Sequence, residues 1–383
     1  MAKRIHIAVT PKMMKWARES AHMSVAVAAE KLGVGADDIT AWESGTRQPT
    51  VAQFRKAAKL YKRPSAALLL DDVPKDFTIR HDYRRVHGKA PAASSALTFA
   101  IRKARLLQET SIDLASALGE QPKPSLPTAS LDDDVVSLAK RVREALGITL
   151  EAQFRWPKDE YTPLGQWRGA VEALGVLVVQ FSGVDVDEAR GFSIWSDDWP
   201  LVAINTKDSP RARVFSVLHE LGHLALRAEG LCDFREADGQ TERFCNALAA
   251  EVLVPRTALL AEAAVRAAGA RHPWSDDELS DLSRRYGVSR EVMLLRLVNV
   301  GKATRAHYAL MRKGWDDAPR PKQEGAPPRE RLALAHLGEP YVRLVLDAFY
   351  EKRITARDVA DCFDLKVEFI PKVEALVLGG ARR

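Results

Sequence analysis

The sequence predicts a multidomain, mainly α protein with an all-α N-terminal domain, an α+β middle domain and C-terminal helical segments. Its 383 residues exceed the usual size of one domain. Helical patterns separated by turn glycines fill the first 70 residues and the chain after residue 270. Short apolar runs rich in β-branched residues lie between residues 176 and 205, so a small three-stranded sheet is expected in the middle domain.

The excess positive charge of the chain lies at one end. Residues 1–70 contain 12 Lys and Arg against 5 Asp and Glu, whereas the other 313 residues contain 45 against 46. The formal net charge of +6 therefore belongs to the first 70 residues. An anionic partner such as double-stranded DNA is expected to bind there and not along the whole chain.

Five helical segments are expected in this basic part. Ser24 and Thr50 occupy N-cap positions, and Gly33 and Gly45 follow two of the expected helix ends. Pro64 begins the last turn, because its fixed φ suits the first position of a helix. The segments are Lys12–Ala21, Ser24–Leu32, Asp37–Ser44, Val51–Tyr61 and Pro64–Leu70.

Two proline-rich stretches predict linkers. Residues 119–127 contain three prolines, and residues 316–330 contain four prolines among charged side chains. A long amphipathic helix is expected at Ser95–Leu118. The expected domains are 1–72 (helical), 73–134 (helical connector and linker), 135–270 (α+β), 271–315 (helical), 316–330 (linker) and 331–383 (helical tail).

The middle domain is expected to hold three strands and then two helices. The strands are predicted at Val176–Phe181, Gly191–Trp195 and Leu201–Asn205. Pro210 opens a helix that runs to about Ala228, and a second helix covers Thr241–Leu253 before Pro255.

The first of these helices contains the motif His219-Glu220-Leu221-Gly222-His223. Residues four apart share one helix face, so two imidazole nitrogens can bind a single zinc ion. Glu220 is offset by about 100° and can reach a water molecule beside the metal. The apolar neighbours of the motif predict a buried helix, in which His and Glu side chains must be paired or bound to a metal.

A tetrahedral zinc site with one open position needs a third protein ligand. Glu242 and Glu251 both lie on the next helix, but nine positions separate them, so only one can face the metal. We expect Glu242, because Asn246 follows one turn later on the same face and suits a supporting role behind a ligand. Cys232 and Cys245 are alternative ligands, although a small buried cysteine without a metal is the more usual case.

These residues resemble the ImmA/IrrE family of zinc metallopeptidases. The resemblance rests on His219–His223 and Glu242–Pro255, and on the strand segments Arg190–Ser193 and Pro200–Asn205. It covers about residues 160–260 and implies a minimal zincin fold with one Zn²⁺ per chain. It also implies that His219, His223 and Glu242 bind the metal, that Glu220 is the general base and proton shuttle, and that repressor proteins are the substrate class.

The first domain resembles the XRE (lambda-repressor-like) helix–turn–helix family over about residues 12–70, and the family implies that Gly35–Ser44 is the recognition helix. Val25 stands where these proteins usually have a phosphate-binding Gln. Two acidic residues open the recognition helix, where the helix dipole favours them but DNA phosphates do not. The expected DNA-binding residues are Thr40, Arg47, Lys56 and Lys59, with Lys62 and Arg63 as further candidates; the acidic pair is Asp37 and Asp38.

The sequence therefore predicts a regulatory zinc metalloprotease that carries its own helix–turn–helix domain. It would hydrolyse a peptide bond in a repressor or antitoxin-like protein by means of zinc-activated water. The strand Leu201–Asn205 is a candidate for pairing with an extended substrate. The alternative is a DNA-binding transcription regulator or antitoxin in which the zincin domain is a sensor or a structural module.

Composition favours the cytoplasm. No apolar run approaches the roughly 18 residues that a membrane span needs, and the basic N-terminus lacks the apolar segment of a secretory signal. Three widely spaced cysteines, Cys232, Cys245 and Cys362, argue against a disulfide framework. The expected partners are a protein substrate, double-stranded DNA and a second copy of the chain in a homodimer. Association with a membrane is not expected.

Overall fold

The computed structural model describes residues 5–73, 94–227, 230–232, 239–316 and 327–380. They divide into two compact units, Met1–Lys103 and Ala104–Arg383. The predicted fold class is confirmed, because helices dominate and the strands are confined to the middle of the chain. The division between the units falls inside helix α5 (Ser95–Leu118), and most of the predicted linker at 316–330 lies outside the described residues. The predicted domain boundaries therefore stay predictions.

Unit 1 is a set of short helices that begin and end at local signals. The Ser24 hydroxyl accepts a hydrogen bond from the Val27 amide at 3.2 Å, and Thr50 forms a capping box with Gln53. Gly33 and Gly45 adopt the left-handed conformation directly after two of the helices. The elements are α1 (Pro11–Ser20), α2 (Val25–Leu32), α3 (Ala36–Ser44), α4 (Val51–Leu60) and the 3₁₀ helix η1 (Ser65–Leu69).

The core of unit 1 is apolar with one buried ion pair. Trp42 of α3 and Tyr61, directly after α4, are each 1% exposed. Arg18 of α1 is buried, and its Nε donates to Oε1 of Glu43 on α3 at 2.6 Å. The pair joins α1 to α3, and removing one partner would leave a buried charge without its counterion.

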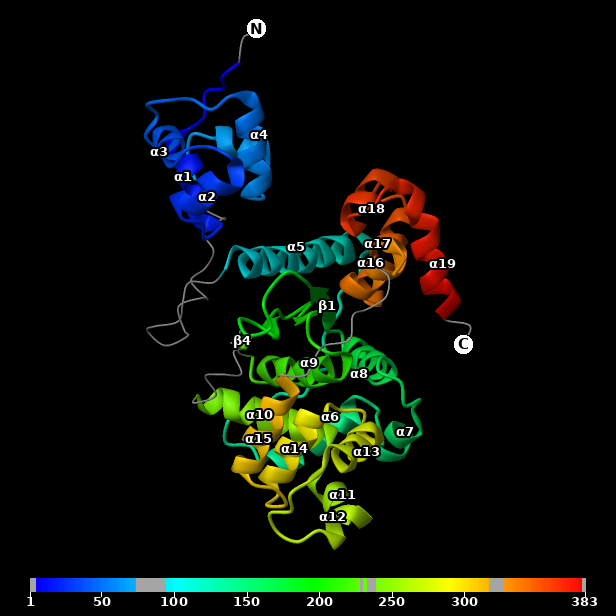
Figure 1. Cartoon of the computed structure of the whole chain (residues 1–383). Helices are drawn as coiled ribbons and strands as arrows, with labels where there is room; N and C mark the ends of the chain where they lie inside the picture. Colours follow the sequence, from blue (N-terminus) through cyan, green and yellow to red (C-terminus); the bar gives the residue numbers. More distant parts are fainter. Residues whose placement is uncertain (1–4, 74–93, 228–229, 233–238, 317–326, 381–383) are drawn as a thin grey trace. The chain divides into compact units, whose positions relative to one another are not determined.

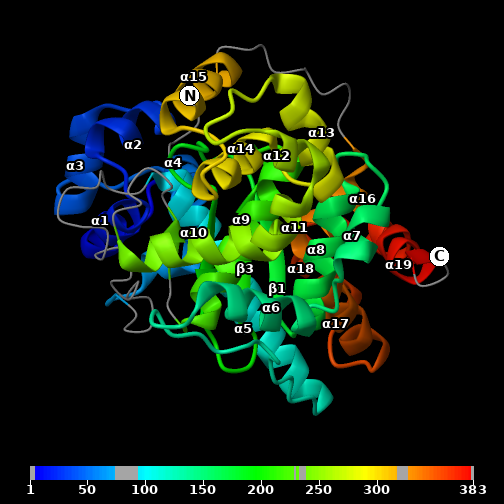
Figure 2. The same ribbon diagram turned by 90° about the horizontal axis from the view of Figure 1, so that it is seen from below.

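Within unit 2, helices from α6 to α14 and the sheet share an apolar core in which Trp167 and Trp274 are fully buried. Helix α9 packs against the sheet on one side and against α8 and α10 on others (Figure 1 and Figure 2). The helices before the C-terminal region are the second part of α5, α6 (Val135–Ala145), α7 (Leu150–Arg155), α8 (Thr162–Ala173), α9 (Pro210–Ala225), α10 (Gln240–Leu253), α11 (Arg256–Ala261), α12 (Ala263–Ala267), α13 (Asp276–Tyr286), α14 (Arg290–Asn299) and α15 (Arg305–Asp316).

The sheet contains the three predicted strands and a fourth that the sequence did not indicate. The strands are β1 (Leu177–Phe181), β2 (Gly191–Ile194), β3 (Leu201–Asn205) and β4 (Gly230–Cys232), in the order β1-β3-β2-β4. β1 and β3 are parallel, whereas β2 pairs antiparallel with both β3 and β4. β4 has three residues and begins with Gly, so its strand character comes from pairing with β2 and not from local propensity.

The topology corrects one expectation about substrate pairing. β3 is a central strand, with Leu201 opposite Leu177 of β1 on one side and opposite Ile194 of β2 on the other. Its backbone groups are therefore used within the sheet, and β3 cannot accept an additional strand. The outer strands of this sheet are β1 and β4.

The proline-rich segment after α5 lies along unit 2 without helix or strand structure. The Ser125 amide donates to the carbonyl of Leu174 at 2.9 Å, and the Ala129 amide donates to the carbonyl of Ala225 at 2.9 Å. The second bond places the segment next to the end of α9. Within the described residues, no helix combines the length and the apolar character that a membrane span requires.

The C-terminal helices cover the outer edge of β1. Ala335 of α16 accepts hydrogen bonds through its carbonyl from Arg168 of α8 at 2.6 Å and from Gln180 of β1 at 2.9 Å. Arg168 also donates to the carbonyl of Val178 in β1. The elements of this region are α16 (Arg329–Leu337), α17 (Glu339–Tyr350), α18 (Ala356–Phe363), η4 (Val367–Phe369) and α19 (Ile370–Gly380).

Candidate metal centre

Helix α9 carries the first part of the centre. The Ser209 hydroxyl caps its first turn by accepting a hydrogen bond from the Ala212 amide at 3.3 Å, and Pro210 fits the first helical position. His219 and Glu220 are completely buried, and His223 is 2% exposed. The buried helix predicted from the sequence is confirmed.

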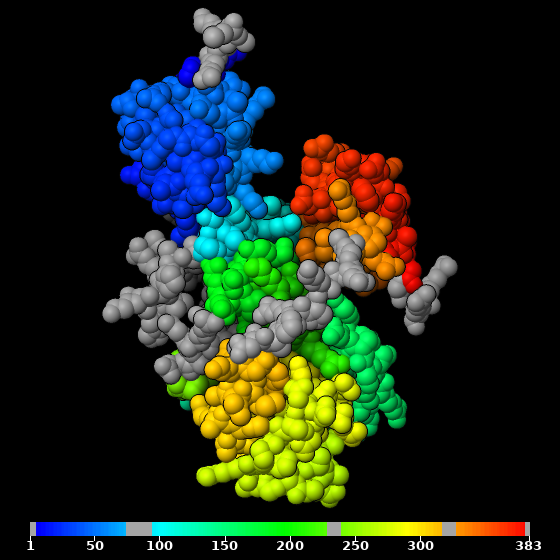
Figure 3. Space-filling model, in the orientation of Figure 1, coloured from blue at the N-terminus to red at the C-terminus, as the bar shows by residue number. Residues whose placement is uncertain are grey.

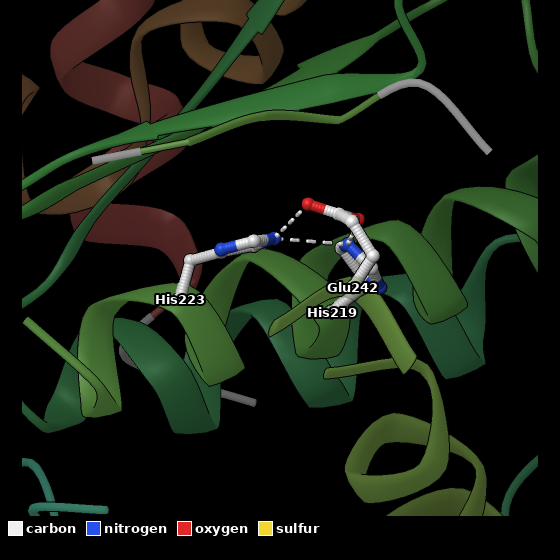
Figure 4. A group of neighbouring side chains, drawn as sticks. All are labelled: His219, His223 and Glu242. Carbon is white, nitrogen blue, oxygen red and sulfur yellow. Dashed lines mark hydrogen bonds and ion pairs between the residues drawn. The ribbon is translucent and has the colours of Figure 1, made fainter. Parts of the chain in front are cut away.

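Three side chains from two helices meet at one point. Nε2 of His219 and Nε2 of His223 are 3.2 Å apart, and Glu242 of α10 places Oε2 3.3 Å from the first and Oε1 3.2 Å from the second. Figure 4 shows the three side chains pointing toward one another, with strands of the sheet passing over them. Glu242 is 21% exposed and lies on the more open side of the group.

The donor atoms of these three residues are close enough to hold one metal ion. Metal–nitrogen distances of about 2.0–2.1 Å in a tetrahedral site place two ligand atoms about 3.3 Å apart. The separation of 3.2 Å between the two Nε2 atoms agrees with that value, and each of these nitrogens lies 3.2–3.3 Å from a different oxygen of the Glu242 carboxylate. Two imidazoles and one carboxylate are a donor set that zinc accepts. The predicted trio His219, His223 and Glu242 is thus brought together as a group able to hold one metal ion.

Glu220 lies beside the sheet, and its carboxylate occupies space that is free because residue 191 of β2 is a glycine. A Cβ at Gly191 of β2 would lie 3.0 Å from Oε1 of Glu220 and 3.0 Å from the carbonyl oxygen of Ala203. Only glycine leaves this space to the carboxylate. The position of Glu220 is therefore determined by a strand that lies about 30 residues earlier in the chain.

A second glycine sets the distance between α9 and α10. A Cβ at Gly222 would lie 3.2 Å from Sγ and 3.3 Å from Cβ of Cys245, which is tighter than ordinary van der Waals contact. Cys245 also forms a hydrogen bond with His223. The close contact brings Glu242, one turn before Cys245, up to the two histidines. Asn246 is half-buried on the same helix, and its supporting role stays a prediction.

We expect Gly222→Ala to lower the zinc affinity of the purified protein by about 10- to 100-fold, since displacing a supporting contact of a metal site costs this much. The new methyl group must push α10, and with it Glu242, away from α9. Competition with a chromophoric chelator measures the affinity. Gly169→Ala on α8 is the matched control, because a Cβ at Gly169 meets nothing within 4 Å. Equal affinities of the two variants would contradict the spacing role of Gly222.

The alternative ligand Glu251 faces away from the histidines. It is buried in an ion pair with Arg296 of α14, and its Oε1 accepts a hydrogen bond from the Arg256 amide at 2.9 Å. Nε of Arg296 donates to the carbonyl of Val254 at 2.9 Å. Glu251 therefore holds the end of α10 against α14. Of the two soft alternatives, Cys245 lies behind His223, and the side chain of Cys232 lies outside the described residues.

The charges within the centre depend on one another. Burial lowers the pKa of His223, but hydrogen bonds to Cys245 and Glu242 and the nearby charge of Glu220 outweigh this and raise it to about 11. Burial raises the pKa of Glu242, but hydrogen bonds from His219 and His223 outweigh that effect and lower it to about 2. Without a metal, His223 therefore carries a proton at neutral pH and Glu242 is ionised.

Metal binding is expected to displace this proton. A ligating His223 must be neutral, so its proton leaves when an ion binds at any pH between 7 and about 10, in addition to any proton lost from metal-bound water. The association constant for zinc should then rise about tenfold per pH unit in this range, because the metal-free state binds more protons than the complex. Titration calorimetry at pH 8 in buffers of different ionisation enthalpy gives the number of protons released. A value near zero would contradict the protonated state of His223.

The sequence leaves the residue that would stabilise an oxyanion open among His272, Tyr286 and Arg243, and the first two of these take part in other contacts. His272 Nε2 lies 3.2 Å from Oε1 of Glu278. The Tyr286 hydroxyl donates to Oε1 of Glu262 at 3.1 Å, and Tyr286 is completely buried. Arg243 is exposed on α10. None of these observations assigns the role.

The predicted DNA-contacting residues are exposed on two helices and a turn of unit 1. Thr40 lies on α3, Arg47 lies between α3 and α4, and Lys56 and Lys59 lie on α4. Asp38 caps α3 by accepting a hydrogen bond from the Gly35 amide at 3.2 Å, and it also pairs with Arg47. The stabilising role predicted for this aspartate at the helix N-terminus thus has a structural basis.

Comparison with known families matches both parts of the chain. Residues 171–298 match the Peptidase_M78 family, described as an IrrE N-terminal-like domain. Residues 14–68 match the HTH_3 family, described as a helix-turn-helix. No curated protein matches the chain. Both resemblances predicted from the sequence are confirmed over these residues.

Proposed function

We propose that this chain, which combines an IrrE/ImmA-like Peptidase_M78 domain with an N-terminal helix–turn–helix domain, is a regulatory zinc metallopeptidase. Its substrate would be a repressor or an antitoxin-like protein. The observation that carries the proposal is the cluster of His219, His223 and Glu242, in which both histidines are buried and the buried Glu220 lies next to them. A structural metal site has no need of a further buried carboxylate beside its ligands.

His219, His223 and Glu242 would hold the metal. A bound Zn²⁺ supplies Lewis acidity that makes water a nucleophile near neutral pH and polarises the scissile carbonyl. The lowered pKa of Glu242 keeps this ligand ionised, whereas the raised pKa of His223 means that its proton must leave before the ring can bind the metal. Cys245 orients that histidine from behind.

Glu220 would move the proton that hydrolysis requires. Its carboxylate is completely buried, follows His219 directly in the chain and is given room by Gly191. It would take the proton from the attacking water and deliver it to the leaving amine. A carboxylate in an apolar setting is suited to both halves of this transfer, because water does not compete for the proton.

The helix–turn–helix domain supports a regulatory role. Such a domain binds DNA, so a peptidase fused to it acts where repressors and antitoxins act. We place the protein in the cytoplasm, because Cys245 and Cys362 are free thiols. The alternative, a transcription regulator whose zincin domain has no peptidase activity, makes the opposite prediction in the following experiment.

Zinc-loaded and chelator-treated protein are incubated with a cell extract, and new protein N-termini are identified by mass spectrometry. We expect a small set of new N-termini with the zinc-loaded protein alone, including one within a DNA-binding repressor or an antitoxin. Restoring zinc to the chelated sample should restore them. Identical N-termini in all samples, with about one zinc per chain confirmed, would favour the alternative.

A further inference from the structure

The positive charge of unit 1 is concentrated in one stretch. Residues 44–70 contain six Lys and Arg and no Asp or Glu. The helix in this stretch is α4, which lies away from α3 in both views of the ribbon (Figure 1 and Figure 2). Three of these six cations, Arg55, Lys56 and Lys59, thus lie on a helix other than the recognition helix.

The cations of α4 form a continuous stripe. Phe54, Ala57 and Ala58 bury one face of the helix in the core of unit 1. Arg55, Lys56 and Lys59 are exposed on α4 away from that face, with Arg55 and Lys59 one helical turn apart, and the exposed Lys62 follows the helix by two residues. We call these four residues the basic stripe. The lighter blue part of unit 1 in Figure 3 includes α4 at the molecular surface.

Three other exposed cations of unit 1 lie beside acids. Lys12 pairs with Asp72, Lys15 lies 4.0 Å from Glu19, and Arg47 pairs with Asp38. Within the part of the chain that the structure describes, no such acid stands beside Arg55, Lys56 or Lys59, and Lys62 lies 4.8 Å above the ring of Phe99.

Like charges one helical turn apart repel each other, so the stripe weakens α4 unless an anion binds to it. The exposed surface of α3 has no comparable charge. Asp37 is exposed in its first turn, Thr40 is neutral, and the charge of Arg47 is balanced by Asp38. Phosphate contacts supply most of the affinity of a DNA-binding domain, and they require cations. The recognition helix can contribute base contacts, but it lacks the charge for strong attraction.

We propose that the basic stripe of α4 is the principal polyanion-binding surface of unit 1, and that its ligand is the phosphate backbone of a nucleic acid. The proposal deepens the DNA-binding role suggested for this domain and rests on it. A nucleic acid suits the stripe better than an acidic protein does. An ion pair between one exposed lysine or arginine and one carboxylate of a protein contributes little binding free energy. A nucleic acid has a high linear charge density and releases condensed counterions when a cation contacts a phosphate, so four such contacts give appreciable affinity.

The test compares two triple variants of the full chain with equal loss of charge. The stripe variant carries Arg55→Gln, Lys56→Gln and Lys59→Gln, and the control carries Lys12→Gln, Lys15→Gln and Lys31→Gln. Fluorescence anisotropy measures binding to labelled duplex DNA, duplex RNA and polyglutamate over a range of salt concentrations. Circular dichroism and zinc content show that each variant is folded.

We expect the stripe variant to bind duplex DNA at least about tenfold more weakly, with a salt slope smaller by about 2.7, the value for three lost phosphate contacts. The control should keep the slope of the unmodified chain. Equal losses in both variants would show a general charge effect and overturn the proposal. Binding of polyglutamate but of neither nucleic acid would assign the stripe to an acidic protein and also overturn it.

Failure of the proposal is distinguishable from failure of the DNA-binding role. If the stripe variant binds DNA as the unmodified chain does while Thr40→Ala weakens binding, the DNA-binding role stands and the stripe is not the surface. If the unmodified chain binds neither DNA nor RNA at low salt, both ideas fail. RNA binding that exceeds DNA binding, and is lost in the stripe variant alone, supports the stripe with RNA as its source of phosphate.

Discussion

Replacing Glu220 by glutamine is expected to leave about one zinc per chain and to lower the rate of peptide hydrolysis by about 10²–10⁴-fold, the usual contribution of a general acid–base group. Glutamine has the size and shape of glutamate, so it fits the space beside Gly191. It cannot accept the proton of the attacking water. The measurement is the single-turnover rate on a substrate identified from its new N-terminus, together with the metal content of the same sample.

The exposed carboxylate of Glu144 on α6 provides the control, because Glu144→Gln makes the same chemical change with 64% of the side chain in solvent. It should change neither rate nor metal content. Hydrolysis by Glu220→Gln at the unmodified rate would remove Glu220 from the reaction. A loss of zinc in this variant would instead show that Glu220 supports the metal ligands.

A variant of strand β2 tests whether the position of the Glu220 carboxylate, and not only its presence, is needed for hydrolysis. Gly191→Ala keeps the carboxylate but places a methyl carbon 3.0 Å from it and from the carbonyl oxygen of Ala203. Either the side chain or the strand must move, so hydrolysis should fall although zinc is retained. An active Gly191→Ala with unchanged rate would show that the carboxylate tolerates displacement.

Local signals predicted much of the fold because they act within a few residues. Ser24, Thr50 and Ser209 cap helices where the sequence placed helix starts, although Ser209 itself was not singled out. The helical period of His219 and His223 determined that both histidines share a face. β4 was missed because three residues beginning with Gly have no strand preference of their own.

The parts of the centre that were not predicted are contacts between distant segments. The room for Glu220 comes from Gly191, and the approach of α10 comes from Gly222 against Cys245. A glycine in a sequence shows only that a side chain is missing, not which neighbour uses the space. In the same way, Asp38 and Arg47 are nine residues apart and meet because the chain turns back after α3 ends at Ser44, which charge counting does not reveal.

The sequence offered both Glu242 and Glu251 as the third metal ligand, and the structure favours Glu242. Substitution of each by glutamine should therefore have opposite effects on zinc affinity and on stability. Glu242→Gln is expected to lower zinc affinity by more than about 100-fold, because even a supporting residue of a metal site is worth 10- to 100-fold. The fold should remain, since Glu242 lies at the open side of the centre with 21% of its side chain exposed. Chelator competition measures the affinity, and thermal unfolding without metal measures the fold.

Glu251→Gln should do the reverse. It leaves the buried Arg296 without its counterion, and breaking such a pair by removal of one partner costs about 3–5 kcal/mol of unfolding free energy. Zinc should still bind at one ion per folded chain, because Glu251 belongs to the contact between α10 and α14 and not to the histidines. If Glu251→Gln loses zinc while Glu242→Gln retains it, the two carboxylates exchange roles, and α10 must be rotated by about half a turn relative to α9 when the metal is bound.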